Sequence, residues 1–200
     1  MKKLLALVLA LALTVSSASA AEFRDFKDVD DIRYPEAVAV LNRLGIITGF
    51  EDGYFHPDWS LSRGAAAKII VSLLLGSDAA GAMSSDGSPY PDVPSGYTFA
   101  GVISHCKASG LIDGYADGTF RPKGVLTGCA FAKMLLGVLG YDNTREGFSG
   151  EGWTQNVTRA ASSAGLLDGL DFQGSEPIDR ETACQMAYNT LKAKMTAYDS

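Results

Sequence analysis

The chain has 200 residues, of which 46% are hydrophobic, and its formal net charge at pH 7 is −6. This hydrophobic fraction is typical of a chain that folds around a core and argues against intrinsic disorder. The acidic balance is dispersed along the sequence and argues against binding to nucleic acid, because phosphate recognition requires a basic face.

The N-terminus has the three parts of a secretory signal peptide. Two lysines precede an apolar run at residues 4–15, and Ala18-Ser19-Ala20 forms a small-residue cleavage site. The apolar run is shorter than the roughly 20 residues that a membrane-spanning helix needs. We therefore predict a signal peptide at residues 1–20, export of the chain, and no membrane span after the signal is removed.

One nine-residue phrase occurs twice in the sequence. GFEDGYFHP at Gly49–Pro57 recurs as GYADGTFRP at Gly114–Pro122, and FKDV at Phe26–Val29 is answered by YPDV at Tyr90–Val93. A third copy contains GLLDG at Gly165–Gly169 but lacks the long phrase. Internal repetition is thus the main organising feature of the chain. The predicted copies are residues 23–76, 88–141 and 148–196.

Each copy predicts two helices joined by a loop, because apolar residues recur at spacings i, i+3, i+4 and i+7. In the first helices the apolar positions are Ala37, Val40, Leu41 and Leu44; Phe99, Val102, Ile103 and Cys106; and Val157, Ala160, Ala161 and Ala164. In the second helices they are Ala66, Ile69, Ile70 and Leu73; Phe131, Met134, Leu135 and Val138; and Ala183, Met186, Ala187 and Thr190. Ser62, Thr127 and Asp179 are the predicted N-caps of the second helices. The fold class is therefore all-α, and since a unit of about 50 residues buries too little surface alone, the three units should pack into one body.

The repeated phrase itself predicts a constrained loop. Its Asp-Gly step favours a tight turn with glycine at positive φ, its phenylalanine can be buried, and its proline delays the next helix. These positions are Asp52, Gly53, Phe55 and Pro57 in the first copy, and Asp117, Gly118, Phe120 and Pro122 in the second. The loop lacks the alternating oxygen ligands of a calcium site.

The three cysteines, Cys106, Cys129 and Cys184, fall within predicted helices. An odd number cannot form a closed disulfide framework, and no pair has the spacing of metal ligands, which only His56 and His105 could assist. We expect buried, free cysteines and neither a metal nor a cofactor, with a Cys106–Cys129 bridge as the alternative.

These features resemble the S-layer homology domain, a module that attaches bacterial surface proteins to the cell wall. The family's repeat reads roughly F-x-D-V, a Trp-led helix, G-[IV]-x-x-G-x-x-D-G-x-F-x-P, and [IV]-T-R-A-E at the start of the second helix. The first copy carries FKDV, GIITGFEDGYFHP and LSR, the second YPDV, GLIDGYADGTFRP and LT, and the third Trp153, GLLDG and IDRE. The resemblance covers about residues 23–196 and is strongest in the loop phrase that occurs twice.

The resemblance implies a pseudo-threefold prism, with helices at the centre and grooves between the lobes. It implies a secreted, wall-associated or S-layer-associated protein without catalytic residues. Its expected partner is a secondary cell-wall polysaccharide, often bearing ketal-linked pyruvate, or peptidoglycan. By resemblance, the ligand-binding residues of the grooves are Arg63, Arg180, Trp153, Gly49, Gly114 and Gly169.

The chemistry of these residue types suits an acidic sugar. Arginine can bind a carboxylate through two parallel hydrogen bonds, tryptophan can stack on the apolar face of a sugar, and glycine lets the backbone approach a ligand. Arg63 and Arg180 follow the predicted N-caps directly, so we expect free helix amides beside them to favour the same anion.

The chain also departs from the family pattern. Gly128 stands where the second copy should have arginine, Arg33 and Thr98 stand where two tryptophans are expected, and the motif glutamate is absent from every copy. At most one or two grooves are therefore expected to be intact. The alternative is an exported scaffold with decayed glycan grooves that binds protein partners. An enzyme is a third hypothesis, without support from any G-x-S-x-G, H-E-x-x-H or Walker motif.

Overall fold

The computed structural model describes residues 22–198, so the predicted signal peptide lies outside the described residues. Within that range the secondary structure is helical and contains no strand, only isolated β-bridges, and the predicted all-α class is confirmed. The α-helices are α2 (Pro35–Arg43), α3 (Arg63–Leu75), α4 (Ser77–Ala82), α5 (Ala100–Ala108), α6 (Gly128–Val138), α7 (Trp153–Ser163) and α8 (Arg180–Lys192). Two short 3₁₀ helices, η2 (Phe23–Asp25) and η3 (Val29–Asp31), precede them.

The predicted helix pairs are α2 with α3, α5 with α6, and α7 with α8. The N-caps of the second helices are confirmed, because the side-chain oxygens of Ser62, Thr127 and Asp179 each accept the amide hydrogen three residues on, at 3.2, 3.3 and 2.7 Å. Helix α4 was not predicted. It begins directly after Gly76, whose φ of +90° ends α3.

The two helices of a pair are buried to different extents. Every predicted apolar position of α3, α6 and α8 is buried. In the first helices, five predicted positions remain only half-buried: Val40, Leu44, Phe99, Ala160 and Ala164. The second helices therefore form the centre of the molecule, and the first helices cover them.

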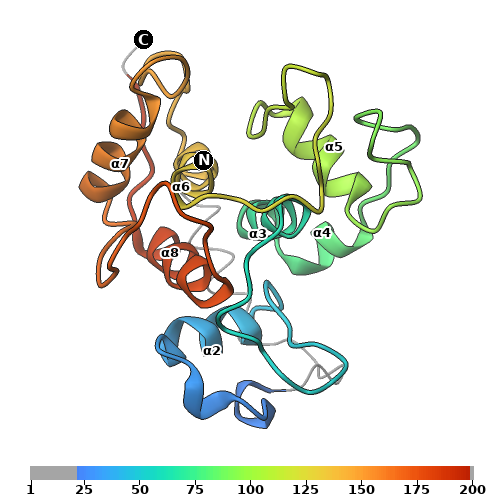
Figure 1. Cartoon of the computed structure of the whole chain (residues 1–200), viewed down its shortest axis with the longest axis vertical. Coiled ribbons are helices and arrows are strands. Elements are labelled where there is room, and N and C mark those ends of the chain that lie inside the picture. The colour runs from blue at the N-terminus through green and yellow to red at the C-terminus, as the bar shows by residue number, and fades with distance from the viewer. Residues whose placement is uncertain (1–21, 199–200) are drawn as a thin grey trace.

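The outer helices connect the copies in a cycle. Helices α3, α6 and α8 contact one another in the middle, while α5 packs on α3, α7 on α6 and α2 on α8 (Figure 1). Each outer helix thus packs on the central helix of another copy, and the first copy closes the cycle by packing on the third. The exact threefold symmetry of a prism stays a prediction.

A ring of three backbone hydrogen bonds ties the copies together immediately before the central helices. The Leu61 amide donates to the Ile178 carbonyl at 2.8 Å, Ile178 donates to Leu126 at 2.9 Å, and Leu126 donates back to Leu61 at 3.2 Å. All three side chains are buried. Because the ring needs one strand-like residue from each copy, it forms only when all three copies are in place.

The cysteines are free and buried, as expected, and the alternative Cys106–Cys129 bridge is not formed. Burial raises the pKa of the Cys106 and Cys184 thiols to about 12, so both stay protonated at neutral pH. They pack as small apolar side chains.

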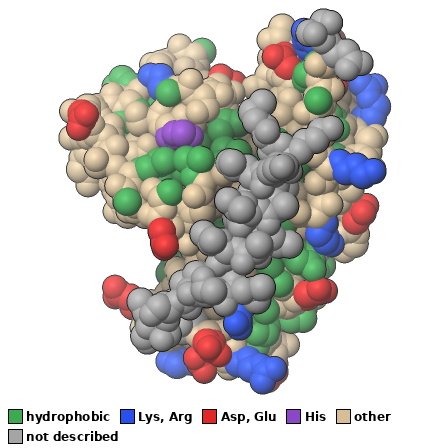
Figure 2. Space-filling model, turned by 180° about the vertical axis from the view of Figure 1, so that it is seen from behind, with side chains coloured by type: hydrophobic (Ala, Val, Ile, Leu, Met, Phe, Trp, Pro, Cys, Tyr) green, Lys and Arg blue, Asp and Glu red, His purple; other side chains and the backbone are tan. Residues whose placement is uncertain are grey.

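The surface carries charges of both signs. Seen from behind, acidic and basic side chains are interspersed over the visible part of this face and do not gather into a basic patch (Figure 2). On this face the charges are thus distributed as on a solubilising surface.

The shortened loop of the third copy fits closely against Gly128. A Cβ atom added at Gly128 would lie 2.9 Å from Cε2 of Phe172 and 3.1 Å from the Gln173 carbonyl oxygen. Phe172 therefore occupies the space into which a side chain at position 128 would extend.

We predict that Gly128→Ala lowers the free energy of unfolding by about 1–3 kcal/mol, because the new methyl group overpacks this contact. Urea denaturation of residues 21–200 measures the change. In a Phe172→Ala background the added cost should shrink.

Gly81→Ala is the matched control. Gly81 lies in α4 with no atom within 4 Å of the added Cβ, so this substitution should be neutral or stabilising by up to about 1 kcal/mol. Equal losses at the two positions would contradict the overpacking explanation.

Candidate functional site

The two long loops are each fixed by the aspartate of the upstream F-x-D-V or Y-P-D-V motif. One carboxylate accepts two consecutive loop amides, from the buried phenylalanine and from the residue after it. The acceptors are Asp28 for Phe55 and His56, and Asp92 for Phe120 and Arg121, at 2.6 to 2.8 Å. His56 and Arg121 have φ angles of +54° and +57°, which side-chain-bearing residues rarely adopt. The carboxylate thus stabilises a strained backbone. This role was not predicted, although the recurrence of an Asp-Val step 27 or 28 residues before the loop phenylalanine in both copies is the signal for it.

The Asp-Gly turn within each loop is confirmed. Asp52 Oδ1 accepts the Tyr54 amide and Asp117 Oδ1 accepts the Thr119 amide, both at 3.0 Å. The second carboxylate oxygens of Asp52 and Asp117 lie 2.8 Å from His56 Nε2 and Arg121 Nη2. These carboxylates are therefore engaged within the loops.

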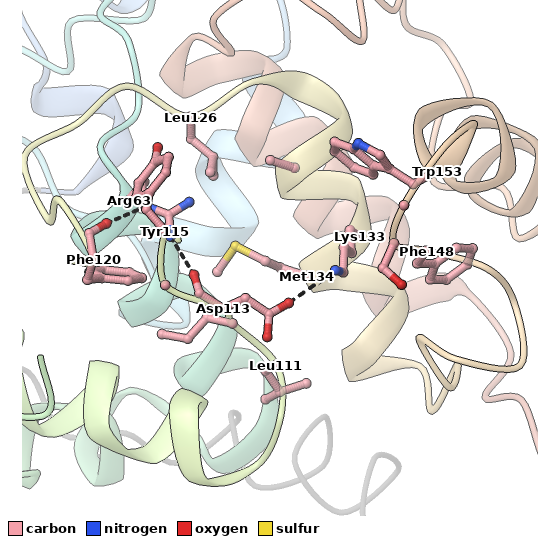
Figure 3. Close-up of a pocket in the computed structure, with 15 residues that line it drawn as sticks. Arg63, Leu111, Asp113, Tyr115, Phe120, Leu126, Lys133, Met134, Phe148 and Trp153 are labelled. Atoms are coloured by element: carbon pink, nitrogen blue, oxygen red, sulfur yellow. Dashed lines mark hydrogen bonds and ion pairs between the residues drawn. The ribbon is translucent and has the colours of Figure 1, made fainter. Parts of the chain in front are cut away.

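Two arginines reach from the start of a central helix into the loop of the following copy. Arg63 donates from Nε to the Phe120 carbonyl and from Nη2 to the Asp113 carbonyl, both at 2.8 Å (Figure 3). Arg180 of the third copy repeats the pattern toward the first copy, donating from Nε to the Phe55 carbonyl and from Nη2 to the Thr48 carbonyl, both at 2.9 Å. Each arginine thus connects two copies through hydrogen bonds and also places a positive charge between them.

Both guanidinium groups are removed from water without an ionic partner. Arg180 is 8% exposed and Arg63 is half-buried, and burial lowers the pKa of both groups from the ordinary 12.5. Arginine nevertheless stays charged at neutral pH. Among residues 22–198 neither arginine forms an ion pair, since the acceptors are neutral carbonyl oxygens. Each site therefore holds a guanidinium group without an ion-pair partner, although Asp113 and Asp92 near Arg63, and Asp28 near Arg180, offset part of its charge.

The first cavity, with a volume of about 280 Å³, surrounds Arg63. Gly114 and Trp153 line the same cavity, together with Lys133, whose Nζ lies 3.3 Å from Asp113 Oδ2 (Figure 3). Arg63 comes from the first copy, Gly114 from the second and Trp153 from the third. Three of the predicted residues are thus brought together from three different copies.

The second cavity, of about 380 Å³, is lined by Arg180, Gly49 and Lys68. Again three copies contribute, because Phe99 of the second copy completes the lining. Gly169, the remaining predicted residue, has a φ of +78° and lines neither cavity. The sequence analysis missed Lys68 and Lys133, although they occupy equivalent positions in the first two copies.

The expectation of free helix amides beside the arginines is wrong. The first two amides of each central helix donate to carbonyl oxygens of the following copy's loop, and the N-cap side chain takes the third. The donor and acceptor pairs are Arg63 with Gly124 and Gly64 with Pro122; Gly128 with Glu176 and Cys129 with Gly174; and Arg180 with Trp59 and Glu181 with Pro57. The guanidinium groups, and not the helix ends, are therefore the groups available to an anion.

The third position of the cycle differs from the first two. Gly128 replaces the arginine and is covered by Phe172. Arg33 stands at the position of the first copy where the family pattern has a tryptophan. It forms ion pairs with Asp179 and with the buried Glu181 of the third copy. Hydrogen bonding to Glu181 raises the pKa of Arg33. The arginine-based site is thus kept in two of the three positions.

A metal centre finds no support in the part of the chain that the structure describes, where no three His, Cys, Asp or Glu side chains are grouped to hold an ion. Across residues 22–198, no helix combines the length and the apolar character needed to cross a membrane.

Comparison with known proteins identifies relatives at cell surfaces. Residues 25–67 and 89–132 match the S-layer homology domain. The chain is 26% identical to the surface layer protein of Brevibacillus choshinensis over 98% of this chain and 17% of the relative, and 28% identical to a cell surface protein of Thermoanaerobacter kivui over 99% and 26%. It is 31% identical to the cellulosome-anchoring protein of Acetivibrio thermocellus over 50% of this chain and 22% of the relative. The chain thus spans about a quarter or less of the length of these relatives.

The loop geometry predicts a loss of stability in acid. Burial alone would raise the pKa of the Asp92 carboxyl, but the Phe120 and Arg121 amides outweigh it and hold the pKa below the ordinary 3.8. Hydrogen bonds within the turns also lower the pKa of Asp52 and Asp117. A depressed folded-state pKa contributes stability above the unfolded value, and that stability is lost as the pH falls through the folded value. The unfolding free energy should therefore be level above about pH 5 and fall below about pH 4.

Asp92→Asn tests the loop contact. We expect a loss of about 1–2 kcal/mol at pH 7, because the amide side chain cannot accept both backbone hydrogens, and a shallower decline between pH 4 and 2. Urea denaturation at several pH values measures both. Asp86→Asn, at an exposed position without a side-chain hydrogen bond in the described structure, is the control and should match wild type. A decline as steep in Asp92→Asn as in wild type would remove Asp92 from the explanation.

Proposed function

We propose, on the premise that this chain belongs to the S-layer homology family, that it is a non-catalytic module anchoring non-covalently to the bacterial cell wall. The family and the surface-layer and cell-surface relatives locate the chain at the cell surface, in association with surface layers. The relative named as a cellulosome-anchoring protein supports an anchoring role.

The observation that carries the proposal is the pair of guanidinium groups without an ion-pair partner, Arg63 and Arg180, each lining a cavity between copies. Their hydrogen bonds to neutral carbonyls fix the guanidinium planes without neutralising them. A carboxylate on the ligand would supply an ion-pair partner at contact distance, with charge-assisted hydrogen bonds to the remaining donors. Because the chain as a whole is acidic, this attraction depends on contact at the two cavities rather than on long-range steering.

The ligand that fits these sites is a wall saccharide carrying carboxylates. A secondary polysaccharide with ketal-linked pyruvate provides such a group, and so does the lactyl ether of a muramic acid residue that carries no stem peptide. Trp153 offers an aromatic surface in the first cavity. Gly49 and Gly114 line the cavities with their backbone, and packing requires glycine there, because an added Cβ would meet Phe26 Cε1 at 2.5 Å and Tyr90 Cε1 at 2.7 Å.

A second candidate function is a scaffold whose grooves have decayed and that binds protein partners. The contact between Gly128 and Phe172 favours it at one position, since an aromatic ring there fills the space of the missing arginine. The retained arginines at the other two positions favour the anchoring function.

Co-sedimentation with purified cell walls of the source organism tests the proposal. Residues 21–200 are mixed with intact walls or with walls acid-stripped of secondary polysaccharide. We expect binding to intact walls, a loss of about tenfold to a hundredfold for Arg63→Ala or Arg180→Ala, and little binding by the double variant, because each substitution removes a charged hydrogen-bond donor.

Arg121→Ala is the matched control, since it removes the same charge from an exposed arginine that is already paired with Asp117. Thermal unfolding of every variant separates lost binding from lost folding, because Arg180 also ties two copies together. Equal weakening by Arg121→Ala, or no wild-type binding to either wall, would contradict the proposal. Equal binding to stripped walls would identify peptidoglycan as the ligand.

A further inference from the structure

The loop of the first copy carries a group of aromatic side chains that the second copy lacks. We call Phe50, Tyr54, His56 and Trp59 the aromatic cluster. Trp59 is 49% exposed, Phe50 42% and Tyr54 38%, which is unusual for large apolar side chains lying next to one another.

The cluster holds Trp59 in a fixed orientation. The His56 and Trp59 rings stack with their centroids 3.7 Å apart and their planes 7° from parallel, while Phe50 lies against Trp59 at 5.2 Å. His56 is itself fixed by its Nε2, which lies 2.8 Å from Asp52 Oδ2. His56 therefore covers one face of the indole. The 49% of Trp59 that is exposed belongs to the rest of the ring.

Trp59 and Phe50 line the second cavity, beside Arg180 and Lys68. In the described part of the chain, neither of these two cations forms an ion pair. An exposed aromatic surface next to two unpaired cations offers complementary contacts to a ligand that is apolar on one face and anionic at one edge.

The tryptophan of each cavity comes from a different kind of element, a helix in the first cavity and a loop in the second. In the first cavity the indole is Trp153 at the start of α7, and Gly124 occupies the loop position that corresponds to Trp59. In the second cavity the helix wall contributes Phe99, and the indole comes from the loop. Each cavity therefore has one tryptophan, although only one of them follows the repeat pattern.

We propose that Trp59 is a ligand-contacting residue of the second cavity, where its indole stacks on a sugar ring whose carboxylate binds Arg180 and Lys68. This inference rests on the proposed function and assigns it a second, differently built subsite. A cavity of about 380 Å³ is within the range of small-ligand sites. The carboxylate-bearing sugar has two sources, a pyruvyl ketal on a wall polysaccharide or the lactyl group of a muramic acid residue without a stem peptide.

Tryptophan fluorescence can observe each cavity separately, because the chain contains only two tryptophans. Residues 21–200 with Trp153→Phe report on Trp59, and the same chain with Trp59→Phe reports on Trp153. The probes are the methyl glycoside of an N-acetylhexosamine that carries a pyruvyl ketal, the methyl glycoside of N-acetylmuramic acid, and the uncharged methyl glycoside of the same N-acetylhexosamine without the ketal. N-acetylglutamate serves as a carboxylate without a sugar ring.

We expect the Trp59 emission to change saturably with at least one acidic sugar, and not with the uncharged sugar or with N-acetylglutamate. The sugar that produces the change identifies the source of the carboxylate. In calorimetric titration of chains with Trp153→Phe, further replacement of Trp59 by Ala should weaken binding of that sugar about tenfold, as expected for the loss of an aromatic stacking partner, and replacement by Phe should weaken it less.

Tyr54→Ala is the matched control, since Tyr54 belongs to the aromatic cluster but does not line the cavity. The inference is overturned if Trp59→Ala binds as tightly as its parent, if Tyr54→Ala weakens binding equally, or if N-acetylglutamate changes the emission as the sugar does. Wall binding that is lost in the Arg63 and Arg180 double variant but is unaffected by Trp59→Ala would leave the proposed function standing and remove only this subsite.

Discussion

Three backbone hydrogen bonds close a ring through Leu61, Ile178 and Leu126, and the arrangement of the three copies depends on this ring. Each bond is modest by itself, with a net contribution of about 0.5–1.5 kcal/mol. Their position gives them more importance, because each residue lies immediately before a central helix and its side chain is buried. The ring fixes where the three central helices begin and therefore how their apolar faces meet.

The same constraint explains why the candidate sites lie between copies. Once the central helices start from a common ring, their first amides face the loop of the following copy and donate to its carbonyls. Arg63 and Arg180, one residue past the N-cap, extend along those loops and bind two further carbonyls each. A residue that a single helix would expose to solvent thus becomes part of a cavity wall. Its guanidinium group has no ion-pair partner because the loop oxygens that it binds are carbonyl oxygens.

Departures from the repeat are accommodated locally. The third copy has a shorter loop, and Phe172 fills the space beside Gly128 where the other copies have arginine. In the first copy, the His56 ring stacks on Trp59, which adds an aromatic surface to the second cavity. The shared ring and central helices keep the architecture while the three sites between copies diverge, so sequence similarity among the copies does not imply that the sites bind alike.

The sequence by itself determined the elements of this protein. The spacing of apolar residues predicted the helix pairs, Ser62, Thr127 and Asp179 marked the N-caps, and the Asp-Gly steps marked the turns, because each of these signals acts over a few neighbouring residues. Similarity between copies also indicated Arg63 and Arg180 as a related pair.

Only the tertiary structure decided which residues share a site. Arg63, Gly114 and Trp153 are separated by long stretches of chain and come from three copies, and no local pattern states that each copy completes the site of another. Two further contacts could not be predicted from the sequence. The first amides of the central helices donate to loop carbonyls, and Trp59 lines the same cavity as Arg180. Their common physical reason is that these contacts form only after the ring and the central helices have closed the cycle.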